Sequence, residues 1–151
     1  MRISFTGTRR GMTSLQKESI ARWLGQQRQV VSASHGMCEG ADEDFHIILR
    51  NVLGHDVFIA GFPSTATSRS RMVLDCDYVA PAKRPLERNP DIVNAGKDVL
   101  LAAPCAMHEL QRSGTWNAIR YATRKKIRVE IFWPMEKERK CPPSPGLPLQ
   151  R

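Results

Sequence analysis

Short apolar runs alternate with amphipathic stretches over most of the chain. The apolar runs predict five strands, at residues 2–6, 30–34, 56–60, 98–103 and 128–133, with a shorter and less regular element at 74–79. The fourth run, Val99-Leu100-Leu101-Ala102-Ala103, is apolar at every position. Such a run is typical of a strand that is buried on both faces of a sheet.

Helical spacing fills the gaps between the predicted strands. Thr13 and Gln16 have the spacing of a capping box, which predicts the start of a helix of about four turns. Asp42 is expected to cap a second helix, which Gly54 ends. The stripe of that helix expected to be buried comprises Phe45, Ile48, Leu49 and Val52.

Two further helices are predicted in the second half of the chain. Pro85 suits the first turn of a helix at 86–95, which Pro90 is expected to interrupt or shorten. Ser113 is expected to cap a helix at 114–125.

The alternation of strands and helices predicts an α/β fold. We expect a single-domain, Rossmann-like, doubly wound and mainly parallel sheet with helices on both faces, spanning residues 1–134. Five of the ten prolines fall from Pro134 onward, so residues 135–151 are expected to form a flexible tail. Open parallel sheets bind ligands in the crevice beyond the carboxyl ends of their strands, so function is expected in the loops that follow the strands.

Charge and cysteine content narrow the class of partner. With 23 Lys and Arg against 15 Asp and Glu, the net charge of +8 favours anionic partners such as nucleotides or nucleic acid. No apolar run approaches the length of a membrane span, and the N-terminal residues lack the pattern of a signal peptide. The four scattered cysteines form no CxxC pair, which favours a reduced, cytoplasmic protein over a disulfide framework.

Three of the loops contain residues that suit a phosphate group. Small residues let a ligand approach the backbone, and free N–H groups at a helix start attract anions. The guanidiniums of Arg9 and Arg10 can bind phosphate oxygens bidentately. The predicted ligand-binding residues of these loops are Gly7, Thr8 and Arg9; Gly36 and Gly40; and Ser113, Gly114 and Thr115.

The acidic residues of the second loop suggest a different role. Negative charge at the start of the second helix repels phosphate, so sugar hydroxyls or the base are expected near Glu39 and Asp42, the two candidate catalytic residues. Asp42 and His46 lie four residues apart on one helix face. They form either a general acid/base pair or a structural hydrogen bond that holds the glycine loop.

Besides His46, two more residues complete the predicted ligand-binding set. Arg88 and Asn89 precede the fourth strand by about one helix and could reach across the crevice. The other histidines, His35, His55 and His108, have no zinc-ligand spacing with the cysteines, so no metal site is expected. No cofactor is expected either.

Together these motifs resemble the SLOG superfamily, which joins the Rossmann domain of the DNA-processing protein A (Smf) and the Lonely Guy (LOG) enzymes. The resemblance covers about residues 1–134. It implies a doubly wound sheet that binds nucleotides or nucleotide-derived molecules, usually as a homodimer. The residues that carry it are Gly7-Thr8-Arg9, His35-Gly36, Gly40-Ala41-Asp42 with His46, Arg88-Asn89, and Arg112-Ser113-Gly114-Thr115.

One departure from the LOG pattern separates the possible functions. LOG enzymes hydrolyse the N-glycosidic bond of nucleoside 5′-monophosphates and have a glutamate shortly after a glycine-threonine pair. Gly114-Thr115 match that pair, but Trp116 and Asn117 follow it. Our first expectation is therefore a protein that binds a phosphorylated nucleoside or an ADP-ribose-like molecule, as a sensor or sequestering module.

Two alternatives stay open at this point. An enzyme, either a LOG-like phosphoribohydrolase or a ribosyl transferase, would have to use Glu39 or Asp42 in place of the missing glutamate. Binding of single-stranded DNA, as in the DNA-processing proteins, fits the positive charge, but aromatic residues for base stacking are few.

Overall fold

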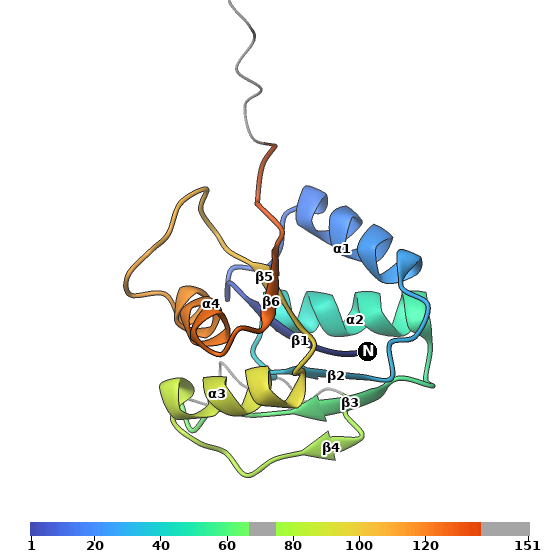
Figure 1. Cartoon of the computed structure of the whole chain (residues 1–151), viewed down its shortest axis with the longest axis horizontal. Helices are drawn as coiled ribbons and strands as arrows, with labels where there is room; N and C mark the ends of the chain where they lie inside the picture. The colour runs from blue at the N-terminus through green and yellow to red at the C-terminus, as the bar shows by residue number, and fades with distance from the viewer. Residues whose placement is uncertain (67–74, 137–151) are drawn as a thin grey trace, which may run out of the picture.

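The computed structural model describes residues 1–66 and 75–136, in which a six-stranded sheet lies between two pairs of helices (Figure 1). The strands are β1 (Arg2–Gly7), β2 (Ser32–His35), β3 (Phe58–Gly61), β4 (Tyr78–Val79), β5 (Val99–Ala103) and β6 (Arg128–Ile131). The helices are α1 (Ser14–Gln26), α2 (Ala41–Leu53), α3 (Pro85–Ala95) and α4 (Gly114–Arg124).

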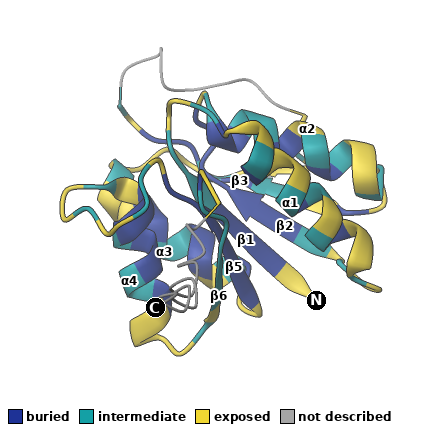
Figure 2. Ribbon diagram, turned by 90° about the horizontal axis from the view of Figure 1, so that it is seen from above, coloured by how far each residue is buried: buried dark blue, intermediate teal, exposed yellow. Residues whose placement is uncertain are grey.

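Every strand pair in this sheet is parallel, and the strand order is β4-β3-β2-β1-β5-β6. The chain moves outward from β1 to β4 and then returns to the other side of β1 to add β5 and β6. Helices α1 and α2 cover one face, and α3 and α4 cover the other (Figure 2). The predicted doubly wound, Rossmann-like α/β fold is therefore confirmed, with its strand order reversing between β1 and β5.

Strand β5 separates the two halves of the hydrophobic core. Leu101 packs in the half that contains Phe45 of α2, whose ring stacks on Phe5 at a centroid distance of 4.3 Å. Leu100 packs in the other half with Val93 of α3. All five residues of β5 are buried, as the unbroken apolar run predicts.

The predicted start of α1 and the predicted start of α4 are both confirmed. Thr13 forms a full capping box with Gln16, and the Ser113 hydroxyl accepts a hydrogen bond from the Trp116 N–H at 3.3 Å. Gly54 ends α2 with a φ of +71°, in the left-handed region that glycine adopts most readily.

The prediction that Asp42 caps α2 is wrong. The N-cap residue is Gly40, and Asp42 is already inside the helix. Its carboxylate instead accepts a hydrogen bond from the Cys38 N–H at 3.1 Å. The predicted stripe also shifts, because Val52 is exposed and Leu53 packs against the core in its place.

Pro90 does not interrupt α3, which continues to Ala95. The residues around the proline are buried on both sides, so tertiary packing holds the helix despite the missing N–H donor. Of the predicted element at 74–79, only Tyr78–Val79 forms a strand, and Leu74 lies outside the described residues. Most of the predicted tail, residues 137–151, also lies outside them.

Gly96 is expected to be indispensable for the packing of α3 on β1. A Cβ at this position would lie 2.2 Å from the Ser4 backbone nitrogen, so Gly96→Ala must push the helix away from the strand and lower the free energy of unfolding by about 3 kcal/mol. Gly25→Ala in α1 is the matched control, since the added Cβ would meet no described atom within 4 Å. Chemical denaturation should show the control equal to wild type or more stable by up to about 1 kcal/mol. Equal stability of the two variants would contradict the packing.

Candidate functional site

A cleft of about 400 Å³ opens where the strand order reverses, at the carboxyl ends of β1 and β5. Crevices at such points are the usual ligand sites of open α/β sheets. The predicted site residues that line this cleft are Gly7, Thr8, Arg9, Gly36, Asp42, Arg88, Asn89, Ser113, Gly114 and Thr115. Glu39, Gly40 and His46 are not among its lining residues, and neither is Arg10, the second guanidinium expected to bind phosphate in the first loop.

The loop after β1 is held in place by its own backbone. The Thr8 N–H donates to the Ala103 carbonyl at 3.2 Å, and the Thr8 carbonyl accepts from the Ala41 N–H at 3.0 Å. Gly7 allows this approach, because a Cβ there would lie 2.5 Å from the Ala41 Cβ. The loop therefore joins the end of β5 to the start of α2, with the Arg9 side chain exposed at the cleft.

Gly40 has a structural role at the point where the first two loops cross. Its φ is +88°, and a Cβ would lie 2.2 Å from the Arg9 carbonyl oxygen. Glu39, beside it, is exposed to solvent away from the cleft. The second loop thus contributes Gly36 and Cys38 to the cleft, and the acidic candidate that remains there is Asp42.

Arg88 is a buried cation that crosses the cleft from α3. One Nη donates to the carbonyls of Gly36 and Phe62, and the other donates to Cys38 Sγ at 3.0 Å. Gly36 leaves the space for this guanidinium, since a Cβ would lie 2.9 Å from it. The Arg88 Nε is buried and has no hydrogen-bond partner among the described residues.

Positive charge in the cleft is only weakly balanced. Within residues 1–66 and 75–136, none of Arg9, Arg88 and Arg112 forms an ion pair with a carboxylate. The one acidic residue that lines the cleft is Asp42. A buried cation without a counter-ion is unfavourable, so an anion that enters this cleft is stabilised.

The start of α4 adds N–H donors to the same cleft. Its first turn contains no acidic residue, so the positive end of the helix dipole is not neutralised locally. A Cβ on Gly114 would point into space free of described atoms for 4 Å. Asn89 ties this end of α4 to α3 by donating to Asn117 Oδ1 at 3.1 Å.

Asp42 is a buried carboxyl beside Arg88 and Cys38. Burial raises its pKa to about 6, although the Cys38 N–H bond and the charge of Arg88 act in the opposite direction. The predicted pairing of Asp42 with His46 is not formed. His46 Nδ1 instead lies 2.9 Å from Nε2 of His35, at the end of β2. Asp42 itself holds the glycine loop through Cys38.

Other lining residues lie outside the predicted ligand-binding set. Pro85, Leu86 and Ile92 of α3 form an apolar wall, and Leu86 is 62% exposed. Cys38 and Cys105 also line the cleft. An exposed leucine carries no signal in a sequence, whereas the position of Cys38 between two predicted glycines could have marked it.

Comparisons with protein-family models, with curated proteins and with solved structures give no match to this chain. The resemblance of its motifs to the SLOG superfamily therefore stays a prediction. Within the described ranges, no helix is both long enough and apolar enough to cross a membrane.

The buried carboxyl of Asp42 should destabilise the fold as pH rises. Its pKa is about 6 in the folded state against an ordinary 3.8, so the folded state binds more protons between these values and wild-type stability falls through that window. Asp42→Asn keeps an oxygen to accept the Cys38 N–H without the charge. The variant should gain stability relative to wild type between about pH 4 and pH 7, by at most about 3 kcal/mol.

Urea denaturation at several pH values measures this difference. Glu39→Gln is the matched control, because it removes an exposed carboxyl from the same loop. A difference in the free energy of unfolding between Asp42→Asn and wild type that does not change with pH would contradict the raised pKa of Asp42.

Proposed function

We propose that this protein binds a nucleotide or nucleotide-derived molecule, such as a phosphorylated nucleoside or an ADP-ribose-like compound, in the cleft between β1 and β5. The observation that carries the proposal is the convergence of Arg9, Arg88 and Arg112, none paired with a described carboxylate, on one cleft. The binding serves a sensor or sequestering role.

The chemistry of the cleft walls supports a division of this ligand into parts. Phosphate belongs at the start of α4 and the loop after β1, where backbone N–H groups and Arg9 lie. The apolar wall of Leu86 and Ile92 suits a base. Asp42, the acidic residue that lines the cleft, can accept a hydrogen bond from a sugar hydroxyl.

The size and lining of the cleft favour a small molecule over single-stranded DNA. Its volume of about 400 Å³ falls within the range of small-molecule sites. Phe5 is the one aromatic residue among its lining residues, so stacking platforms for successive bases are few.

A second candidate function, hydrolysis of a nucleoside 5′-monophosphate, is favoured by one observation. Asp42 lines the cleft, and its pKa is raised to about 6, in the range useful for acid/base catalysis near neutral pH. Cleavage of an N-glycosidic bond needs a carboxyl near the anomeric carbon. Asp42 is the residue to which this proposal assigns that role.

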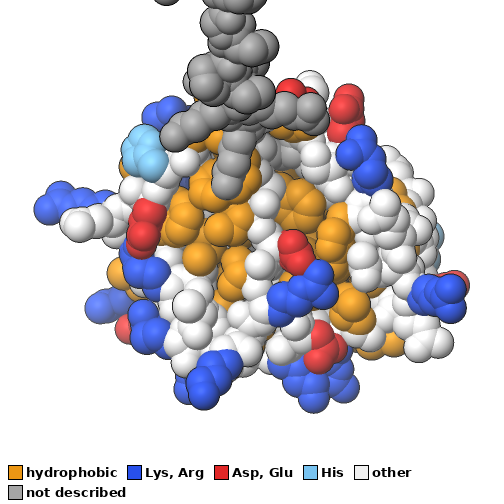
Figure 3. Space-filling model, turned by 45° about the horizontal axis from the view of Figure 1, so that its top comes forward, with side chains coloured by type: hydrophobic (Ala, Val, Ile, Leu, Met, Phe, Trp, Pro, Cys, Tyr) orange, Lys and Arg blue, Asp and Glu red, His pale blue; other side chains and the backbone are white. Residues whose placement is uncertain are grey.

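We also propose a homodimer, formed through the outer edge of β6. An edge strand presents unpaired backbone groups, and Val129 and Ile131 are only partly buried. Figure 3 shows apolar side chains exposed near the centre of one face, with side chains of both charges between and around them. Sedimentation equilibrium should give twice the chain mass of 17.0 kDa, and a monomer mass would contradict the dimer.

Calorimetric titration of the full chain with AMP, ADP, ADP-ribose and adenosine tests the proposed function. Binding of a phosphorylated compound with much weaker binding of adenosine is expected. Chromatography of the bound compound then separates the two candidates: an intact ligand supports the binding protein, and released base supports the hydrolase. Failure of every phosphorylated compound to bind would overturn both.

Arg9 is expected to contribute directly to phosphate binding. A charge-assisted contact contributes about 1.5–3 kcal/mol, so Arg9→Ala should raise the Kd of the best nucleotide roughly 10- to 150-fold. Arg10→Ala is the matched control, because Arg10 is the next residue and is also exposed, but does not line the cleft. Similar Kd values for the two variants would show that the first loop does not bind the phosphate.

Gly114 is expected to be the most sensitive position at the start of α4. A valine there has room in the fold, since a Cβ meets no atom of the described chain within 4 Å. Gly114 lines the cleft at the first turn of α4, so the added side chain would occupy the space proposed for phosphate. Gly114→Val should therefore abolish nucleotide binding with little change in the thermal melt followed by circular dichroism. Normal binding by this variant would place the phosphate elsewhere.

A further inference from the structure

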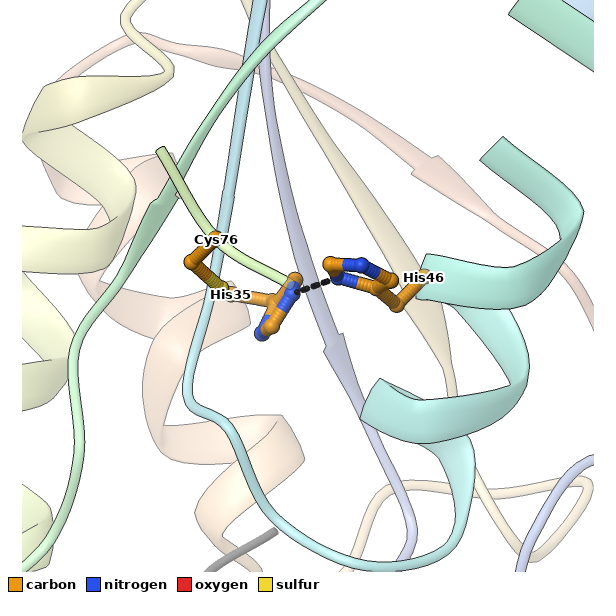
Figure 4. Close-up of side chains that lie close together, drawn as sticks. All are labelled: His35, His46 and Cys76. Carbon is orange, nitrogen blue, oxygen red and sulfur yellow. Dashed lines mark hydrogen bonds between the residues drawn. The ribbon is translucent and has the colours of Figure 1, made fainter. Parts of the chain in front are cut away.

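A second group of chemically active side chains lies outside the cleft lining. His35 from the end of β2, His46 from α2 and Cys76 from just before β4 bring their donor atoms within 4.8 Å of one another (Figure 4). Both histidines are buried, and Cys76 is partly buried. Nothing in the proposed function uses this group.

A second sulfur lies beside Cys76. A Cβ on Gly61 would be 2.3 Å from Met37 Sδ and 3.1 Å from Cys76 Sγ, so the two sulfurs flank the same point of β3. The missing side chain of Gly61 therefore leaves the space that they occupy. Thiol, thioether and imidazole together form a soft donor set.

Hydrogen bonds determine which imidazole nitrogens carry protons and which can act as metal ligands. The Met37 N–H donates to His35 Nδ1 at 3.0 Å, so the proton of a neutral His35 is on Nε2. That Nε2–H donates to His46 Nδ1 at 2.9 Å. The lone pair of His46 Nδ1 accepts this bond and can bind a metal once the bond is released, whereas metal binding at His35 Nε2 would require loss of the Met37 bond.

We propose that Cys76 Sγ, His46 Nδ1 and Met37 Sδ form a binding site for one copper(I) ion. When the ion binds, the Cys76 thiol loses its proton to solvent, a Cu–S bond forms, and no electron is transferred. His35 is a positioning residue: its Nε2–H, released from His46, donates to the Cys76 thiolate.

Charge favours a monovalent ion over zinc at this position. One thiolate neutralises copper(I), whereas a divalent ion would leave a net positive charge in a largely buried site. The charge of Arg50 acts on His46 and Cys76, but Asp75 and Asp77 act on both in the opposite direction, and Asp77 pairs with Arg50 at 3.2 Å. The surrounding charges therefore do not select the ion, and the choice rests on the ligands themselves. Soft sulfur ligands also select copper(I).

The test is competition for copper(I) between the full reduced chain and the coloured bicinchoninate complex of copper(I), under anaerobic conditions. We expect one copper(I) per chain to leave the chelator. Cys76→Ser and His46→Asn should abolish this transfer, and Met37→Leu should weaken it. Met37→Leu nearly conserves volume, so it remains informative if another variant does not fold. His35→Gln should lower affinity by about 10-fold, as expected for a group that supports a ligand.

Cys105→Ser and Cys141→Ser are the matched controls and should transfer copper(I) like wild type. Retained transfer in folded Cys76→Ser, or no transfer by wild type, would overturn the site. Wild-type affinity in Met37→Leu would overturn the thioether ligand. Stoichiometric zinc binding in preference to copper(I) would overturn the choice of ion. Because Met37, His46 and Cys76 do not line the cleft, these results are independent of nucleotide binding.

Discussion

The buried guanidinium of Arg88 is the interaction on which the cleft depends. It connects α3 to the loops after β2 and β3 through the carbonyls of Gly36 and Phe62. A guanidinium is normally buried with a carboxylate partner, because its desolvation is costly. Here carbonyl oxygens and the Cys38 sulfur satisfy part of it, and no ion pair with a described residue neutralises it. An anionic ligand would supply the negative charge that Arg88 lacks.

The doubly wound topology explains why the charge gathers at this position. Loops that follow β1 and β5 leave the sheet in opposite directions, and the space between them is the cleft. Glycines allow the loops to approach closely, because a Cβ would clash with the Arg9 backbone at Gly40 and with the Arg88 guanidinium at Gly36. The start of α4 supplies N–H donors at the same edge. Backbone geometry and charge therefore favour the same class of ligand.

Local patterns in the sequence were sufficient to predict the architecture. Most of the predicted site residues also lie together in one cleft. The apolar run of β5 and the caps at Thr13 and Ser113 depend on neighbouring residues, so they could be read directly. The N-cap of α2 could not be predicted in this way. Two loops cross tightly at that point, and only a glycine, Gly40, fits there, so Asp42 is not the cap. The partner of His46 is set by packing between separate segments, which spacing along one chain does not encode.

The most direct test of the account is a ¹H–¹⁵N NMR titration of the full chain with AMP. Phosphate bound at the reversal of strand order should shift the amide signals of Thr8, Gly114 and Thr115 most strongly. The Gly25 amide in α1, which lies outside the cleft lining, should stay unchanged. Shifts confined to residues outside the cleft lining, or no shifts at saturating AMP, ADP and ADP-ribose, would contradict nucleotide binding at this site.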